Sequence, residues 1–266
     1  MTDGASMQVT HIGGPTVLID VAGWRILTDP TFDPPGRRYA FGLGTSSAKL
    51  TGPAMTIDDV GRVDVVLLTH DHHADNLDLS GRGLLADTPV VVTTRSGARR
   101  LGVPVRGLAA GESLTLTDAH RPPIEVGATP CRHGPPLSRR VVGDVIGFTL
   151  EWPGQERGAC WISGDTVLHP ALMEVATRMR VGVALLHLGG VRFPITGPLR
   201  YTMTARDAVR LCARLGPSVV FPVHYEGWSH FAEGRAAIER RLVTAPDDVR
   251  DVFRWLPIGT PVRVAA

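Results

Sequence analysis

The spacing of apolar positions predicts a strand-rich first half of the chain. Short apolar runs are separated by turn residues, as at Gly13-Gly14-Pro15 and Ala22-Gly23, which is typical of a meander of strands. The expected strands cover residues 8–12, 16–21, 24–28, 63–69, 89–93, 113–117 and 124–129. Helical spacing is expected near 77–85 and 96–101.

In the second half, apolar runs alternate with stretches of helical period. Ala208, Leu211, Cys212 and Leu215 recur at the spacing of one helix face. The expected strands cover 144–152, 159–163, 183–187 and 218–223, and the expected helices cover 169–179, 205–215, 231–242 and 247–255. This alternation predicts an α/β fold in which helices cover the outer faces of two sheets.

Residues 31–54 interrupt the pattern, because they are rich in Gly, Pro and Arg and have little periodicity. We expect a long loop over the sheet edge, and loops of that length are often functional. Since no low-complexity linker divides the chain, we predict one domain over residues 1–266.

Composition and charge are those of an ordinary globular protein. Hydrophobic residues make up 43% of the sequence, charged residues 20%, and the net charge is +2. Neither a nucleic acid nor a membrane is therefore an expected partner, while a homo-oligomer is compatible with these features. Three separated cysteines without a CxxC motif argue against a disulfide framework, and Met1–Ser6 lacks signal-peptide features. We expect a cytoplasmic protein.

The densest polar cluster is His70-Asp71-His72-His73-Ala74-Asp75-Asn76, directly after the expected strand 63–69. Imidazole and carboxylate groups are ligands for zinc, manganese or iron. Three more candidate ligands follow the ends of later strands: His133, Asp165 and His224. Loops at strand ends can hold separate ligands in a fixed arrangement, so the pattern predicts a metal site.

The order of these motifs resembles the metallo-β-lactamase superfamily, and more narrowly its L-ascorbate-6-phosphate lactonase-like branch. The histidine cluster carries the resemblance together with Gly13–Asp20, Leu27–Pro30, Ser163–Thr166 and Pro222–Gly227, so that it covers nearly the whole chain. It implies an αββα sandwich of two mixed β-sheets flanked by helices, with a metal site at one edge of the sheets.

The resemblance also implies roles for single residues. His70 matches the first histidine of the family's HxHxDH signature, and His133 matches the later histidine of the first metal site. Asp165 matches the carboxylate that bridges two metals, and His224 the last histidine of the second site. Asp29 matches a buried aspartate that orients the histidine loop.

The signature itself is irregular and leaves two alignments open. Without a gap, His70 and His72 form the histidine pair, but no aspartate follows at the expected position. With one inserted residue, His70 and His73 form the pair, Asp75 is the aspartate, and Asn76 replaces the final histidine. We favour the second alignment because it retains the aspartate. Since asparagine is a poorer zinc ligand than imidazole, we expect an intact first site and a weakened second site.

We therefore expect one or two metal ions per chain, zinc first, with manganese or iron as alternatives. The candidate metal ligands are His70, His72, His73, Asp75, His133, Asp165 and His224. A bound cation lowers the pKa of its water towards about 7 and polarises a carbonyl or phosphoryl oxygen. Asp75 and Asp165 are the predicted catalytic carboxylates, because they can hold that water and accept its proton.

The pattern favours a metal-dependent hydrolase acting on a small-molecule ester, lactone or phosphate ester. Candidate substrate-pocket residues lie in the C-terminal loops: His187, Arg192, Tyr201 and His230. One alternative is a phosphodiesterase or nuclease of the same fold, which the near-neutral charge disfavours. Another is a catalytically degenerate protein that binds a metabolite or a partner, because the central motif is altered.

Overall fold

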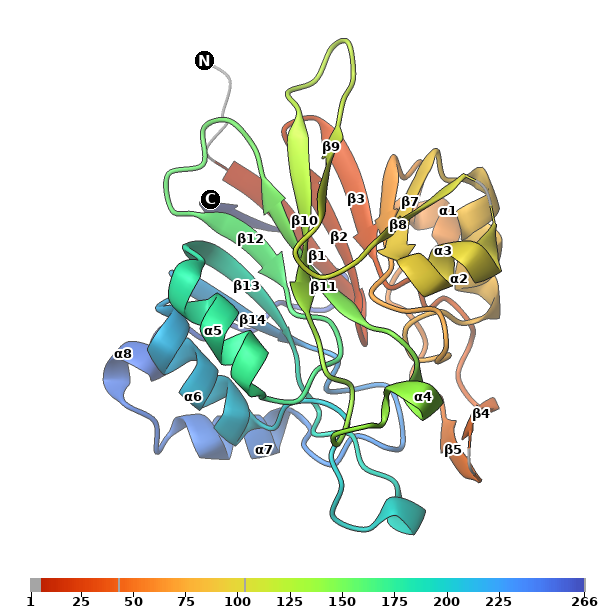
Figure 1. The fold of residues 1–266 in the computed structure, drawn as a ribbon, viewed down its shortest axis with the longest axis vertical. Coiled ribbons are helices and arrows are strands. Elements are labelled where there is room, and N and C mark those ends of the chain that lie inside the picture. Colours follow the sequence, from red (N-terminus) through yellow and green to blue (C-terminus); the bar gives the residue numbers. More distant parts are fainter. Residues whose placement is uncertain (1–5, 43, 103, 266) are drawn as a thin grey trace.

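The computed structural model describes residues 6–42, 44–102 and 104–265, and within them two β-sheets lie face to face (Figure 1). The first sheet has the spatial order β15 (Val262–Ala265), β1 (Ser6–Gly13), β2 (Thr16–Val21), β3 (Trp24–Thr28), β6 (Val65–Leu67), β7 (Val90–Thr94) and β8 (Val105–Leu108). The second has the order β14 (Val219–Val223), β13 (Val181–His187), β12 (Ala159–Ile162), β11 (Ile146–Glu151), β10 (Ile124–Pro130) and β9 (Ser113–Leu116).

Both sheets are mixed, and their parallel parts carry the strand ends that matter for the site. In the first sheet β3, β6, β7 and β8 run parallel, and in the second β12, β13 and β14 run parallel. The meander β1–β2–β3 and the strands β9 to β12 are antiparallel. Neighbouring parallel strands end at one edge of their sheet, so the loops that follow them gather there.

Helices cover the outer faces of the two sheets (Figure 1). The first sheet is covered by α1 (Ile57–Val60), α2 (Leu79–Leu84) and α3 (Arg95–Leu101), and the second by α5 (Pro170–Arg178), α6 (Ala205–Leu215), α7 (Arg235–Leu242) and α8 (Asp247–Arg250). Helix α6 begins with a capping box at Thr204 and ends at Gly216 in the left-handed conformation, so its predicted bounds are confirmed. The predicted αββα sandwich is confirmed as well.

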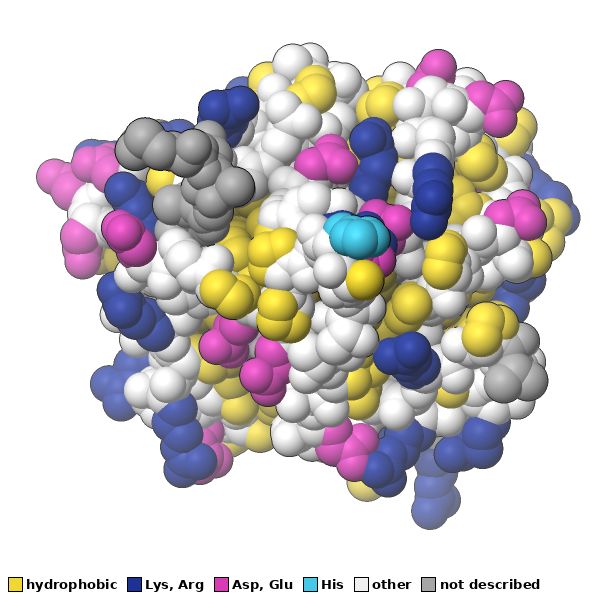
Figure 2. Space-filling view, turned by 90° about the horizontal axis from the view of Figure 1, so that it is seen from above, with side chains coloured by type: hydrophobic (Ala, Val, Ile, Leu, Met, Phe, Trp, Pro, Cys, Tyr) yellow, Lys and Arg dark blue, Asp and Glu magenta, His cyan; other side chains and the backbone are white. Residues whose placement is uncertain are grey.

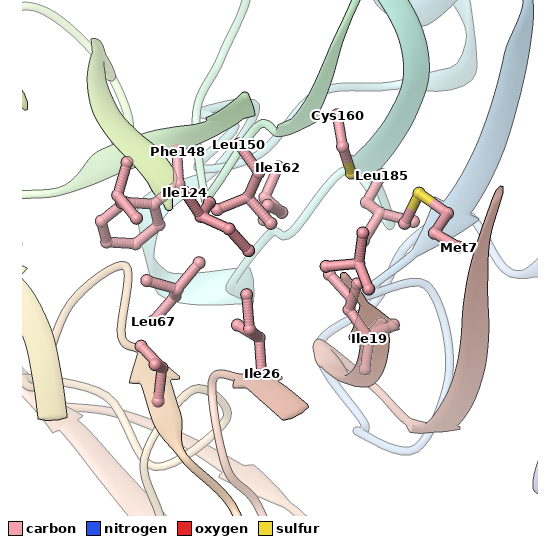
Figure 3. Close-up of a cluster of buried hydrophobic side chains, with 14 of the residues drawn as sticks. Met7, Ile19, Ile26, Leu67, Ile124, Phe148, Leu150, Cys160, Ile162 and Leu185 are labelled. Carbon is pink, nitrogen blue, oxygen red and sulfur yellow. The ribbon is translucent and has the colours of Figure 1, made fainter. Parts of the chain in front are cut away.

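The main core lies between the sheets, and Figure 3 shows side chains of the two sheets pointing toward one another. Ile26 and Leu67 from the first sheet face Phe148, Ile162 and Leu185 from the second, and all five side chains are buried. Burial of this kind contributes roughly 1.5–3 kcal/mol per large aliphatic or aromatic side chain. The packed core therefore fixes the positions of the strand ends from which the loops at the edge of the sandwich extend.

The expectation of a long irregular loop over residues 31–54 was wrong in part. Within this segment β4 (Arg38–Gly42) and β5 (Thr45–Ala48) form an antiparallel hairpin. The apolar alternation is weak because the hairpin forms a separate sheet and its strands bury only Phe41 and the polar Ser47. The pattern also failed to predict β8, β15, the one-turn helix α4 (Arg139–Val142) and the 3₁₀ turn η2 (Pro194–Thr196). The helix expected over 247–255 ends at Arg250.

The surface is mixed in charge on the face that Figure 2 shows, where Lys and Arg side chains are interspersed with Asp and Glu. This agrees with the small net charge of +2. No helix among the described residues is long and apolar enough to cross a bilayer.

Candidate metal centre

Three histidines from two loops bring their ring nitrogens together. His70 and His73 follow β6, and His133 follows β10. The Nε2 atom of His70 lies 3.3 Å from Nδ1 of His73, and Nε2 of His133 lies 3.1 Å from the same Nδ1. Two nitrogens that share a tetrahedral zinc ion at the usual bond length lie about 3.3 Å apart. The spacing of this histidine cluster is therefore that of ligands around one ion.

The opposite ring nitrogens of two of these histidines are held by neighbours, which fixes their protonation. Nδ1 of His133 donates to the backbone carbonyl of Tyr201 at 2.7 Å. Nδ1 of His70 lies 3.1 Å from the Thr69 hydroxyl, which itself donates to Asp29 and so accepts from the ring. The nitrogens that face the cluster are consequently left with free lone pairs, as metal ligation requires.

Burial gives the cluster neutral imidazoles across the physiological pH range. Burial, aided by the neighbouring rings, lowers the pKa of His133 to about 3 and the pKa of His73 to about 4. The same causes lower the pKa of His70 well below its usual value. Protons therefore compete weakly with a cation for these nitrogens.

A second group lies next to the first and combines two carboxylates with an imidazole. The ligand atoms of Asp75, Asp165 and His224 all lie within 4.8 Å of one another, and all three side chains are buried. Burial raises the pKa of Asp165 well above its usual range, and the charges of Asp75 and Asp29 add to this effect. Uncompensated negative charge of this kind favours a cation.

Of the fifteen buried side-chain atoms that lack a hydrogen-bond partner among the described residues, eight lie in or beside this second group. They are Asp75 Oδ1, Asn76 Oδ1, both carboxylate oxygens of Asp165, and both ring nitrogens of His224 and His230. Buried polar atoms normally have a hydrogen-bond partner, so such a concentration marks a place built for an ion or a ligand. The donor set of nitrogen and carboxylate oxygen fits a divalent transition metal such as zinc.

Asp29 contacts both the loop that carries His70 and His73 and a residue at the end of a strand in the second sheet. Its carboxylate accepts hydrogen bonds from the Thr69 backbone at 2.7 Å, from the Thr69 hydroxyl at 3.0 Å and from the Asn76 amide at 3.3 Å. His187, at the end of β13, lies 3.2 Å away on the other sheet. Asp29 and His224 have positive φ angles of 35° and 55°, a conformation costly for residues with a Cβ and concentrated at functional sites.

The two histidines between which the alignments differ lie in different surroundings. His73 lies in the histidine cluster, whereas His72 is exposed, with Nδ1 3.5 Å from Asp71. Asp71 in turn binds the Arg100 guanidinium through both carboxylate oxygens, at 2.6 and 2.8 Å. The backbone carbonyl of His73 accepts hydrogen bonds from the backbone N–H groups of Asn76 and Leu77, and this turn brings Asp75 to the second group.

A small pocket opens onto both groups and is walled by apolar side chains. His73, Asp75 and His133 are among its lining residues, and its volume is about 40 Å³. Its walls include Phe41, Val141, Val142, Val191, Phe193 and Tyr201. We call it the apolar pocket. Tyr201 is the one residue expected in a substrate pocket that lines this pocket. Arg192 is exposed, and His187 and His230 are buried, but these three are not among its lining residues.

A larger cleft of about 580 Å³ lies beside His133 and has a different character. Arginines line it, namely Arg95, Arg99, Arg132 and Arg139. Arg95 is paired with Glu112 and Arg139 with Asp144, so half of this positive charge is neutralised. We call it the arginine cleft.

Sequence reasoning missed the contact of His230 with the second group and the aromatic wall of the apolar pocket. His230 Nε2 lies 3.0 Å from Asp75 Oδ2, and Phe41 packs against both His73 and His230. One signal for His230 was present, since it follows His224 by six positions in the same loop. Nothing in the weakly periodic segment around Phe41 indicated that the hairpin would fold over the metal centre.

Comparison with known proteins assigns the family. A model of the beta-lactamase superfamily domain matches residues 24–225, which is most of the chain. The chain is 26% identical over 191 residues to a UPF0173 metal-dependent hydrolase of Methanosphaerula palustris, covering 69% of this chain and 78% of that protein. It is 24% identical over 245 residues to its counterpart in Caldivirga maquilingensis, covering 87% and 92%.

Among solved structures, the fold is similar to that of an isothiocyanate hydrolase from Delia radicum gut bacteria. The TM-score is 0.80 at 19% identity, and the match covers 97% of this chain and 100% of that one. The chain belongs to the metallo-β-lactamase superfamily. It is a metal-dependent hydrolase of that superfamily, so the sequence prediction is confirmed at this level.

Proposed function

We propose that this enzyme hydrolyses a small neutral ester or lactone with a metal-activated water. The observation that carries the proposal is the apolar pocket, which is lined by His73, Asp75 and His133 together with apolar side chains such as Phe41 and Phe193. Pockets of this kind bind uncharged groups, because burying a charge among aromatic and aliphatic side chains is unfavourable. An anionic substrate would find no cationic side chain among the lining residues of this pocket.

The residues present support a division of roles. A divalent cation held by the two groups would supply a water of lowered pKa and polarise the scissile carbonyl. Asp75 lines the pocket whereas Asp165 is fully buried, so Asp75 is the carboxylate that can accept a proton on the substrate side. Asp165 serves to hold the cation. Phe41 and Phe193 restrict water access to the reacting carbonyl.

Zinc is the cation that the first group favours. Three neutral imidazoles with one position left open are the ligand set of several catalytic zinc sites. Manganese prefers more oxygen ligands, and iron accepts a mixture of the two, so the carboxylates of the second group could admit either.

A phosphate ester is the second candidate substrate, because the arginine cleft lies beside His133. Arg99 and Arg132 line that cleft without a carboxylate partner among the ion pairs of the described residues. Guanidinium groups match phosphate oxygens in geometry. Of the residues in the two groups, His133 is the one that lines the arginine cleft, whereas His73, Asp75 and His133 all line the apolar pocket.

A matched substrate panel tests the proposal. Zinc-loaded protein is assayed with short-chain nitrophenyl carboxylates and small aliphatic lactones, and in parallel with mono- and bis-nitrophenyl phosphate. We expect turnover of the neutral carboxylic substrates, its loss on chelation, and a fall of about 10²–10⁴-fold in Asp75→Asn. Preference for either phosphate substrate would contradict the assignment. Full metal occupancy without turnover of any substrate would favour a binding protein instead.

A further inference from the structure

His230 is a buried histidine for which the proposed chemistry has no role. It lies in the loop after β14, and its side chain is 2% exposed. Aromatic rings surround it, with the centroids of Phe41, Phe193 and Phe231 at 5.1, 5.4 and 4.7 Å from its own. An imidazole costs free energy in such surroundings unless its nitrogens are used.

The polar contact of His230 does not have the form of a hydrogen bond. Its Nε2 lies 3.0 Å from Asp75 Oδ2, yet neither ring nitrogen has an aligned hydrogen-bond partner among the described residues. His224 behaves in the same way, with Nε2 3.3 Å from the same oxygen. Ligand atoms that converge on one cation lie about 3 Å apart without pointing at each other.

The second group has lost one imidazole from the family signature. Asn76 stands where the resemblance expects the final histidine, and its amide nitrogen donates to Asp29 and Thr69. The Asn76 side chain thus helps to hold the histidine loop. The group that remains, Asp75, Asp165 and His224, contains a single imidazole.

We infer that His230 supplies the missing imidazole to a second divalent cation, held with Asp75, Asp165 and His224. His230 stands beside that group of three and reaches it at Asp75. His230, in a C-terminal loop, then replaces the imidazole that is absent at Asn76, and the enzyme holds two ions. The inference rests on the proposed function only in requiring a metal site, because it concerns the second ion alone.

The test counts ions and measures their affinity in the full chain. Chelator-stripped protein is reloaded with Zn²⁺ or Co²⁺, the ions per chain are counted by elemental analysis, and each affinity is measured by competition with a chromophoric chelator. We expect two ions in the natural protein. In His230→Phe, which keeps an aromatic ring in the aromatic surroundings, the second ion should bind at least about 100-fold more weakly while the first is unchanged.

Two further variants separate ligation from other roles. His230→Gln keeps a hydrogen-bond donor for Asp75, so it would restore the second ion if His230 only positioned that carboxylate, and that result would overturn the inference. His169→Gln, at a buried histidine outside both groups, should leave both affinities unchanged. In the Co²⁺ protein, hyperfine-shifted imidazole N–H signals should decrease by one in His230→Phe.

The failure of this inference is distinguishable from failure of the proposed function. If the natural protein binds one ion per chain and His73→Ala binds none, His230 does not hold a second ion and the enzyme is a mononuclear hydrolase. No bound ion under any loading condition would contradict both. An unchanged second affinity in His230→Phe would overturn the inference alone.

Discussion

Nε2 of His133 lies 3.1 Å from Nδ1 of His73, although sixty positions of the chain separate the two residues. His133 follows a strand of one sheet and His73 follows a strand of the other, so the contact spans the open edge of the sandwich. It forms only when both sheets are packed face to face. The metal centre is therefore a product of the whole fold.

Replacing Asp29 should weaken both the fold and the metal site. Asp29→Ala removes the acceptor of the buried Thr69 donors and one of the two acceptors of the Asn76 amide, which costs roughly 2–4 kcal/mol of the free energy of unfolding. Metal affinity should fall about 10–100-fold, because Asp29 acts on His70 through the Thr69 hydroxyl. Denaturant unfolding and chelator competition measure the two effects. Asp29→Asn keeps a hydrogen-bond acceptor, and asparagine tolerates the positive φ. An equal loss of stability and metal affinity in Asp29→Asn and Asp29→Ala would therefore contradict the role assigned to the Asp29 hydrogen bonds.

Gly81 and Gly83 in helix α2 offer a matched pair for stability. A Cβ at Gly81 would overlap the backbone carbonyl of Pro30, the residue after Asp29, whereas a Cβ at Gly83 would meet no atom within 4 Å. Gly81→Ala should therefore lower the free energy of unfolding by about 2–4 kcal/mol. Gly83→Ala should raise it by up to about 1 kcal/mol, since alanine favours the helix. Thermal unfolding of the two variants tests the prediction, and similar melting temperatures would contradict it.

The metal-free protein should lose stability as the pH falls from about 6.5 toward 4. Burial lowers the folded-state pKa of His73 to about 4 and of His133 to about 3, below the unfolded value of 6.5. The unfolded state therefore binds more protons in this window, and stability increases with pH. The loss between pH 8 and pH 5 should reach roughly 2 kcal/mol per histidine.

Denaturant titrations of chelated protein at several pH values measure this dependence. His133→Asn should make it shallower, because one of the buried titrating groups is removed. Constant stability between pH 8 and pH 5 in the chelated natural protein would show that these imidazoles are not buried in the neutral form.

Phe193 should set the size of the substrate that the apolar pocket admits. Phe193→Ala removes one wall, so kcat/KM should rise for bulkier esters relative to acetate esters, and stability should fall by about 3 kcal/mol. Ile195→Ala is the control, because Ile195 is 69% exposed on the same loop. A substrate preference that stays the same in Phe193→Ala would place the substrate elsewhere.

The sequence was sufficient for the sandwich and for most of the residues that the structure brings together in the two groups, since strand periodicity and polar residues at strand ends are local signals. The sequence left open whether His72 or His73 points into the cluster, because one inserted residue in the motif exchanges the two. The packing of Asp75 and Asn76, which is a tertiary feature, determines which histidine points inward. The contact between His230 and Asp75 depends on the course of a loop. The hairpin that carries Phe41 lacked a periodic signal because Phe41 is the one hydrophobic side chain that its two strands bury.

The most direct test of the metal centre compares His73→Ala with His72→Ala. The two histidines are adjacent and chemically identical, but only His73 lies against His70 and His133. Elemental analysis of purified, zinc-loaded protein should show the first ion lost in His73→Ala and full occupancy in His72→Ala. Zinc retained in His73→Ala, or lost in His72→Ala, would contradict the claim that His70, His73 and His133 hold the first ion.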